Sequence, residues 1–151
     1  MEIRIVKTVE EARECDKLLQ SLIIEERDFD SNLNPQININ KWYETQLKKK
    51  GFALFIAYEK EAITGYVCCI LEEEKNTAVI EGIMRIDALY INKAYRRKGI
   101  ADKLIEEAFK WAEKIDTKVV SLKVLSPNKK AISLYEKKGF IETGKMMQRK
   151  I

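Results

Sequence analysis

The apolar residues of the first fifty positions alternate at first and then recur with helical spacing. Residues 3–8 alternate well enough to predict a strand. Helical spacing after this strand predicts a first helix, which ends at an acidic stretch with Asn and Pro at 25–35. A second helix is predicted from about 38 to 50, closed by Gly51 after three lysines. The first helix carries its apolar face on Ala12, Cys15, Leu18, Leu19, Leu22 and Ile23.

The middle of the chain holds its most continuous apolar runs. Residues 52–58 and 62–71 are apolar and aromatic-rich, and the polar residues 59–61 between them predict a hairpin. A polar turn at 72–76 then leads into a long strand over 77–91, which Gly82 interrupts. This part of the chain therefore holds three predicted strands, of which the first two form the hairpin.

The last third is divided more sharply by turn residues. A basic loop at 92–99 precedes a helix over 100–115, and a strand is predicted over 119–125. Ser126 can cap a helix with Pro127 in its first turn, ending at Lys138 before Gly139, and residues 140–148 supply a final strand. With no repeat or linker, the pattern predicts one mixed α/β (α+β) domain over residues 1–151.

Composition excludes several chemistries. The 151 residues include no histidine, so histidine-dependent triads and histidine zinc sites are excluded, and no metal site is expected. The three cysteines form no even disulfide set and fit small apolar residues of a reducing compartment. The charged N-terminus carries no secretory signal, and the apolar runs are too short to span a membrane. We therefore expect a cytoplasmic protein without a membrane partner.

The net charge of +4 is the sum of two unlike parts. Residues 1–92 carry 12 basic and 17 acidic side chains, whereas residues 93–151 carry 16 basic and 7 acidic ones. The first part has a net charge of −5 and the second of +9. An anionic ligand should therefore prefer the C-terminal part and a cationic ligand the remainder, although a solvated surface explains part of the pattern.

A strand, a basic loop with a glycine, and a helix follow one another at 89–104. The start of a helix exposes unpaired N–H groups and the positive end of its dipole, which together bind phosphate. Gly99 permits close approach of the backbone, and Arg96, Arg97 and Lys98 add positive charge. The spacing matches neither the Walker nor the dinucleotide pattern, so a basic turn that caps a helix is the alternative interpretation.

Two separated motifs resemble those of one known family. Residues 89–101, followed by Leu104, resemble motif A of the GNAT superfamily of acyl-CoA-dependent N-acetyltransferases, with its pattern [RQ]-x-x-G-x-[GA]. Residues 122–140 resemble motif B, with its Asn, Ala, Tyr and closing Gly-Phe. The resemblance covers about residues 84–141. It implies a GNAT-like fold: a central, mostly antiparallel mixed sheet, helices on both faces and a splayed central strand pair.

The resemblance also implies a cofactor site for acetyl-CoA. The amides of 96–101 would cradle the pyrophosphate, the strand around Leu89–Ile91 would bind the pantetheine arm, and the N–H near Leu89 would polarise the thioester carbonyl. Asn128 would contact the cofactor arm, although an Asn here is also an ordinary helix cap. The cofactor-binding residues implied are Leu89, Tyr90, Ile91, Arg96, Arg97, Lys98, Gly99, Ile100, Ala101 and Asn128.

The catalytic residues implied are one acid and an unidentified base. Tyr135 would protonate the leaving thiolate, whereas its helical position alone would make it a core tyrosine. Family members often place a Glu or His base on the long central strand, and here the nearest carboxylates are Glu81 and Asp87. We expect one of these two to act through water; the alternative is that both are surface carboxylates.

The predicted function is transfer of an acetyl group from acetyl-CoA to a primary amine by direct attack in a ternary complex. In the family the loop after the first helix lines the acceptor side, and here it carries Glu25, Glu26, Asp28 and Asp30. These favour a small cationic or protein amine, unless they are only a solvated helix end. An acyl-CoA-binding sensor with little catalysis is the alternative. No nucleic-acid partner is expected, and the protein would be a monomer or homodimer.

Overall fold

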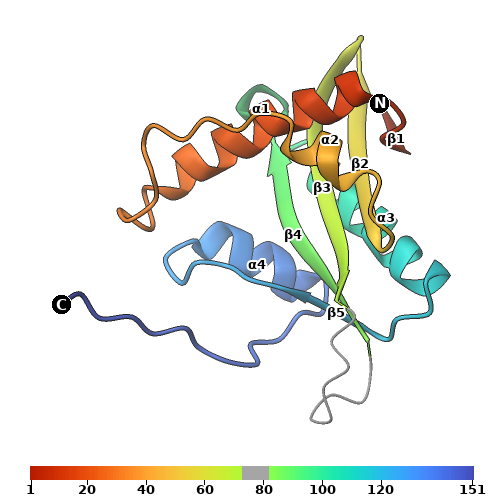
Figure 1. Ribbon diagram of the computed structural model, residues 1–151. Helices are drawn as coiled ribbons and strands as arrows, with labels where there is room; N and C mark the ends of the chain where they lie inside the picture. Colours follow the sequence, from red (N-terminus) through yellow and green to blue (C-terminus); the bar gives the residue numbers. More distant parts are fainter. Residues whose placement is uncertain (73–81) are drawn as a thin grey trace.

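The computed structural model describes residues 1–72 and 82–151, which form a five-stranded sheet with helices on both faces (Figure 1). The strands lie in the order β1-β2-β3-β4-β5; neighbouring pairs are antiparallel except β4 and β5, which are parallel. This architecture confirms the predicted fold class. The elements are β1 (Glu2–Ile5), α1 (Val9–Glu26), α2 (Trp42–Gln46), β2 (Phe52–Glu59), β3 (Ala62–Glu72), β4 (Ile83–Ile91), a 3₁₀ turn η1 (Lys93–Tyr95), α3 (Ile100–Lys114), β5 (Val119–Leu122) and α4 (Lys129–Lys137).

The sheet separates two apolar clusters because successive residues of a strand face opposite sides. On one face, α3 buries Ile100, Leu104 and Ala108 against alternate residues of β2, β3 and β4. On the other face, residues of α1 and α2 pack on the remaining strand positions, where the hydroxyl groups of Tyr43 and Tyr66 are hydrogen-bonded at 3.0 Å. The central strands β2 and β3 are apolar along most of their length because both of their faces are covered.

The start of the first helix follows from its sequence, but the second helix is shorter than predicted. Thr8 and Glu11 form a capping box, in which the Thr8 hydroxyl accepts the Glu11 amide at 3.2 Å. The predicted helix over 38–50 reduces to Trp42–Gln46. Lys41 has a left-handed φ of 58°, and the buried Asp16 of α1 accepts the amides of Trp42 and Tyr43 at 3.2 and 3.0 Å. A tertiary cap therefore decides where this helix begins.

The C-terminal elements differ most from the predictions. Strand β5 ends at Leu122 rather than at 125, and α4 is capped by Asn128 rather than by Ser126. A turn closed by the Asn128 amide on the Leu125 carbonyl at 2.8 Å keeps Pro127 outside the helix. The strand predicted over 140–148 is absent, because this segment pairs with none of the strands in residues 1–72 and 82–151. The part of the predicted strand over 77–91 that precedes Gly82 lies outside the described residues.

None of the helices in residues 1–72 and 82–151 has the length and apolar character needed to cross a membrane.

Candidate active site

Strand β5 pairs with β4 along its whole length but ends at Leu122, whereas β4 continues beyond it, which leaves the opening that the expected splay would need. Their parallel pairing runs from Ile83 opposite Val119 to Ile86 opposite Leu122 and then stops. Strand β4 continues to Ile91, still paired with β3. Within the described residues, the edge of β4 that faces β5 therefore has no strand neighbour from 87 to 91. An extended ligand can use this free edge as a strand would.

A β-bulge in β4 lies where the two strands separate. Cys69 pairs with Ile86 and Cys68 with Ala88, so Asp87 is the extra residue of β4. The bulge reverses the alternation: Ile86 packs on the α3 side and Ala88 on the α1 side. The Asp87 carboxylate is exposed and forms an ion pair with the Arg85 guanidinium at 3.0 Å. The bulge thus places a solvent-accessible carboxylate at the point where β4 and β5 separate.

The loop that joins β4 to α3 is shaped to bind an anion. Arg97 and Gly99 both have left-handed φ values, of 64° and 71°. In the described part of the chain, no acceptor bonds the amide N–H groups of residues 97–102. A Cβ built on Gly99 would have no atom within 4 Å, so the space beside it is open. Free amides at the start of a fifteen-residue helix form a cradle for phosphate.

Arg96 points back into the protein, so its charge is already paired. Its Nε donates to the Ile91 carbonyl at 2.9 Å and its Nη2 to Glu25 Oε2 at 2.7 Å. The same guanidinium lies 5.3 Å from the centroid of the Tyr90 ring. The side chain therefore holds the end of β4 and the C-terminal part of α1 together. The unpaired positive charges at the loop are those of the exposed residues Arg97 and Lys98.

Glu25 accepts a second hydrogen bond on its other oxygen, from the Tyr90 hydroxyl at 2.6 Å, and Lys93 lies 3.8 Å away. Burial alone would raise the pKa of Glu25, but the hydrogen bonds from Tyr90 and Arg96 outweigh it and hold the pKa below its usual value. Burial and the bond to Glu25 raise the pKa of Tyr90 to about 12. The Glu25 carboxylate, which we expected on the acceptor side, is thus already paired with Arg96 and Tyr90.

Arg97 and Lys98 are exposed at the loop, and Lys98 Nζ lies 5.1 Å from the centroid of the Tyr95 ring. Neither side chain forms an ion pair with the described residues. Leu89 and Ile91 pack against the α3-side cluster, so only their backbones remain for a ligand. Ile100 is buried in the same cluster, which fixes the first turn of α3 below the loop.

Helix α4 carries the two predicted residues of the second motif. The Asn128 side chain accepts the Ala131 amide at 3.2 Å, so it is a helix cap, and its NH₂ group has no bond to the described residues. The Tyr135 ring packs edge-on against Phe140 with their centroids 5.8 Å apart. Burial, and then the negative charge of Glu26, raise the pKa of Tyr135 to about 12. Its hydroxyl therefore stays protonated at neutral pH.

The remaining acidic residues of the predicted acceptor side have different surroundings. The Glu26 carboxylate is half-buried with no hydrogen-bond donor or cation within the described residues, and burial followed by the charge of Asp30 raises its pKa. Asp28 is exposed, and Asp30 accepts the Asn32 amide at 3.0 Å. The negative charge of Glu26 also contributes to the raised pKa of Tyr135. Glu81, the other predicted base, lies outside the described residues.

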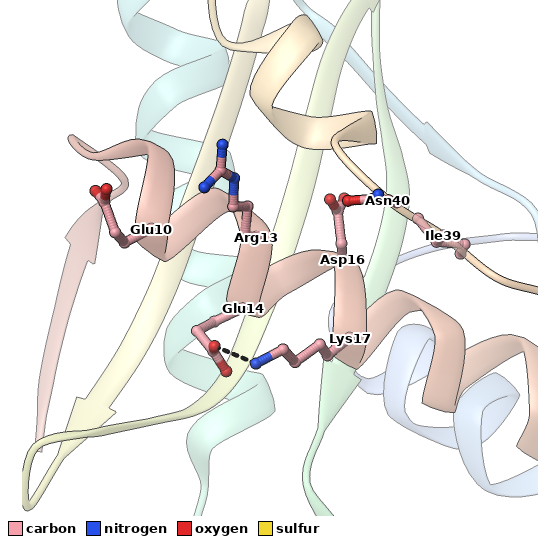
Figure 2. A pocket seen from close by; sticks show the side chains of 7 residues that line it. All are labelled: Glu10, Arg13, Glu14, Asp16, Lys17, Ile39 and Asn40. Atoms are coloured by element: carbon pink, nitrogen blue, oxygen red, sulfur yellow. Dashed lines mark hydrogen bonds and ion pairs between the residues drawn. The ribbon is translucent and has the colours of Figure 1, made fainter.

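Two shallow hollows border α1. One lies between α1 and the chain before α2, where Glu14 pairs with Lys17 at 2.5 Å (Figure 2). It contains none of the predicted site residues. The other lies between α1 and the end of β4, and its lining includes Glu25, Tyr90 and Lys93. Of these two, the second lies at the end of β4, where the loop to α3 begins.

Sequence reasoning missed two features of this site. The first is the contact of Glu25 with Tyr90 and Arg96, which are 65 and 71 residues away along the chain and share no local pattern. The second is the bulge at Asp87: Arg85 and Asp87 alternate with apolar residues as in a regular strand, so the local pattern gives no signal of the bulge.

Comparison with known proteins supports the geometry. Residues 16–140 match the model of the acetyltransferase (GNAT) family. An uncharacterized N-acetyltransferase of Methanocaldococcus jannaschii is 28% identical over 132 residues, covering 85% of this chain and 57% of that protein. An N-alpha-acetyltransferase of Saccharolobus solfataricus is 30% identical over 104 residues, covering 66% of this chain and 62% of that protein. The chain thus spans about three fifths of the length of these relatives.

Solved structures share the fold at low sequence identity. A tetramutant of a Bacillus halodurans protein superposes with a TM-score of 0.85 at 18% identity, covering all of both chains. Aminoglycoside N-acetyltransferase AAC(6')-Iy in complex with CoA superposes with a TM-score of 0.76 at 15% identity, covering 99% of this chain and 98% of that chain. The family model matches most of the chain and agrees with the fold of these structures, and the chain belongs to the GNAT acetyltransferase family.

Proposed function

We propose that the protein transfers an acetyl group from acetyl-CoA to a primary amine by direct attack in a ternary complex. The observation that carries this proposal is the end of β4–β5 pairing at Ile86 and Leu122, with the phosphate-binding loop at the far end of the freed β4 edge. A free strand edge that leads to an anion cradle suits a long ligand with a polyamide arm and a pyrophosphate. Bound acetyl-CoA would supply the activated acetyl thioester.

The loop residues would hold the pyrophosphate mainly through their backbone. The free amides of 97–102 and the dipole of α3 supply partial positive charge, and Arg97 and Lys98 add full charges. Arg96 would act by position, because its guanidinium is paired with Glu25 and fixes the loop to β4. The side-chain oxygen of Asn128 caps α4, and its NH₂ group would contact the cofactor arm.

Tyr135 would be the acid that protonates the departing sulfur. An acid must hold its proton until the C–S bond breaks, and a pKa of about 12 keeps this hydroxyl protonated at neutral pH. The proton lost by the attacking amine would pass through water to Asp87, which the bulge exposes at the point where β4 and β5 separate. Glu81 is the second proposed base. Together these groups move one proton away from the amine and one to the sulfur.

The acceptor would be a small cationic amine or a protein amine. Glu25 is paired within the protein, so the charges available to such an acceptor are those of Glu26, Asp28 and Asp30. Glu26 is the most favourable of these, because its half-buried carboxylate lacks a cation among the described residues and acts electrostatically on Tyr135.

The test combines cofactor binding with turnover. Purified protein is mixed with acetyl-CoA and, separately, a polyamine, an aminoglycoside, a lysine-containing peptide and a peptide with a free N-terminus, and thiol release is followed. We expect thermal stabilisation by CoA and thiol release that depends on one of these amines. Stabilisation by CoA without acceptor-dependent release from any amine would overturn the proposed activity and favour an acyl-CoA-binding module.

The acceptor side is tested with a matched pair of charge variants. Glu26→Gln should raise the KM for a cationic amine at least several-fold while leaving acetyl-CoA affinity unchanged. The control is Asp116→Asn, which removes one negative charge outside the proposed site. Asn tolerates the left-handed backbone conformation of this position, so the control should change neither the KM for the amine nor the affinity for acetyl-CoA. Equal effects of the two substitutions would contradict a local role of Glu26.

A further inference from the structure

Arg85 of β4 lies at the centre of a cluster of three charged side chains. Its Nη1 forms an ion pair with Glu72 Oε1 at the end of β3, and its Nη2 lies 3.0 Å from Asp87 Oδ1. Met84 and Ile86 pack on the α3 side of the sheet, so Arg85 between them faces the opposite side. Arg85 therefore meets both carboxylates on the side of the sheet that carries α1, whose end bears the proposed acceptor carboxylates.

The bulge leaves the Asp87 side chain without strand neighbours that would fix it. A residue of a regular strand contacts the residues opposite it on the neighbouring strands. Asp87 has no partner on β3, because Cys68 and Cys69 pair with the residues on either side of it. Pairing with β5 ends at Ile86, so in residues 1–72 and 82–151 no strand residue lies opposite Asp87 on that side either. Of the described residues, Arg85 alone forms an ion pair or hydrogen bond with this carboxylate, and it therefore orients it.

Arg85 can orient a neighbour because it is itself held from two directions. Its backbone pairs with Ile70 of β3 and with Ser121 of β5, on the regular side of the bulge. Glu72 binds the other terminal nitrogen of the same planar guanidinium, whose geometry is rigid. The position of Asp87 Oδ1 is thereby tied to the paired strands β3 and β4. The second oxygen of this carboxylate, Oδ2, has no partner among the described residues and can accept a proton.

We propose that Arg85 is a positioning residue, which holds the Asp87 carboxylate in the orientation that the base requires; this inference rests on the proposed function. As the amine nitrogen bonds to the acetyl carbon, its proton passes to a water molecule, and that water gives a proton to Asp87 Oδ2. The C–S bond breaks with its electron pair on sulfur, which Tyr135 protonates. A base acts only within hydrogen-bond reach of the proton that it takes, so a carboxylate that rotates freely would lose most of its effect.

A solely structural ion pair would behave differently. An arginine between carboxylates of neighbouring strands could serve only to join β3 to β4. The Arg85 side chain is 37% exposed, and exposed ion pairs contribute little to stability. In that case loss of the guanidinium would change stability slightly and turnover not at all. Measuring turnover and stability on the same variants therefore separates the two roles.

The first experiment is a double-mutant cycle on acetyl transfer to the amine that supports turnover in wild type. Asp87→Asn should lower kcat about a hundredfold and Arg85→Gln about tenfold or more, while the KM for acetyl-CoA stays within about twofold of wild type. Arg85→Lys keeps the positive charge and should recover part of the loss. In the Asp87→Asn background, Arg85→Gln should cause no further loss of kcat, because the carboxylate that it positions is gone.

Arg4→Gln is the matched control. Arg4 also lies between two carboxylates, with its Nε 3.9 Å from Glu2 and its Nη2 2.6 Å from Glu11, but it belongs to the outer strand β1. This substitution should lower the midpoint of thermal unfolding about as much as Arg85→Gln does and leave kcat unchanged.

Glu72→Gln is the second variant, for use where Arg85→Gln does not fold. It releases the guanidinium from β3 and leaves Asp87 in place, so kcat should fall less than in Arg85→Gln. This loss should also vanish in the Asp87→Asn background.

The outcomes separate this inference from the proposed function. Wild-type kcat in Arg85→Gln or in Asp87→Asn, additive losses in the double variant, or an equal loss of kcat in Arg4→Gln would overturn the role of Arg85 and leave acetyl transfer intact. A wild type that binds acetyl-CoA but acetylates no amine would overturn the proposed function, and this inference with it.

Discussion

Gly99 provides a direct test of the anion-binding loop. Its φ of 71° lies in the left-handed region, and a Cβ at this position meets no atom within 4 Å. Substitution by alanine therefore adds conformational strain without a clash. The left-handed conformation costs a residue with a Cβ about 1–2 kcal/mol, so Gly99→Ala should lower the free energy of unfolding by about that amount.

A loop that relaxes in the free protein escapes part of this loss of stability, but it points the amides of 97–102 elsewhere. Binding must then restore their arrangement, and the strain that was relieved weakens the affinity for the cofactor by up to the same amount. Since about 1.4 kcal/mol is tenfold in affinity, the Kd for CoA should rise about five- to thirtyfold. Isothermal titration calorimetry measures this change, and chemical denaturation measures the change in stability.

Gly139 offers a matched control. It also has a left-handed φ, of 87°, and open space where a Cβ would lie, but it follows α4 and lies outside the loop. Gly139→Ala should therefore lower stability to a similar extent and leave CoA affinity near that of wild type. Wild-type affinity in Gly99→Ala, or equal losses of affinity in both variants, would refute the assignment of residues 97–102 as the phosphate cradle.

Three further predictions concern Tyr135, Glu25 and the cysteines. Tyr135→Phe should reduce kcat about a hundredfold or more while the Kd for CoA stays within about twofold, as expected for an acid; an unchanged kcat in steady-state assays would remove Tyr135 from this role. Despite its burial, Glu25 has a lowered pKa because Tyr90 and Arg96 bind its carboxylate. The ionised carboxylate therefore stabilises the folded protein above the pKa that Glu25 has in the unfolded chain, and this contribution disappears as the pH falls through its pKa in the folded protein. Glu25→Gln should be less stable than wild type at pH 7, with a smaller stability loss from pH 5 to pH 3 in urea titrations; parallel curves would contradict this linkage. Burial raises the pKa of all three thiols, that of Cys69 to about 12. A thiol reagent at pH 8 should therefore modify the native protein slowly, whereas in denaturant it should modify all three cysteines rapidly.

Local patterns in the sequence were sufficient for most of the fold. The capping box at Thr8, the hairpin over 52–71 and the apolar face of α3 each depend on residues close in the chain, and each is present in the structure. The loop before α3 was likewise evident, because its glycine, its basic residues and the start of the helix are consecutive. Short-range steric and hydrogen-bonding preferences determine such features.

Three features were decided only by tertiary contacts. Helix α2 begins where the buried Asp16 of α1 caps it. The strand predicted at 140–148 is absent because none of the described strands pairs with this segment. The contact between Glu25 and Arg96 pairs two groups that the sequence assigned separately to an amine and a phosphate. Opposite charges 71 residues apart meet only after the sheet has brought α1 beside the end of β4. The sequence determined which groups are available, and the packing determined which of them remain free to bind a ligand.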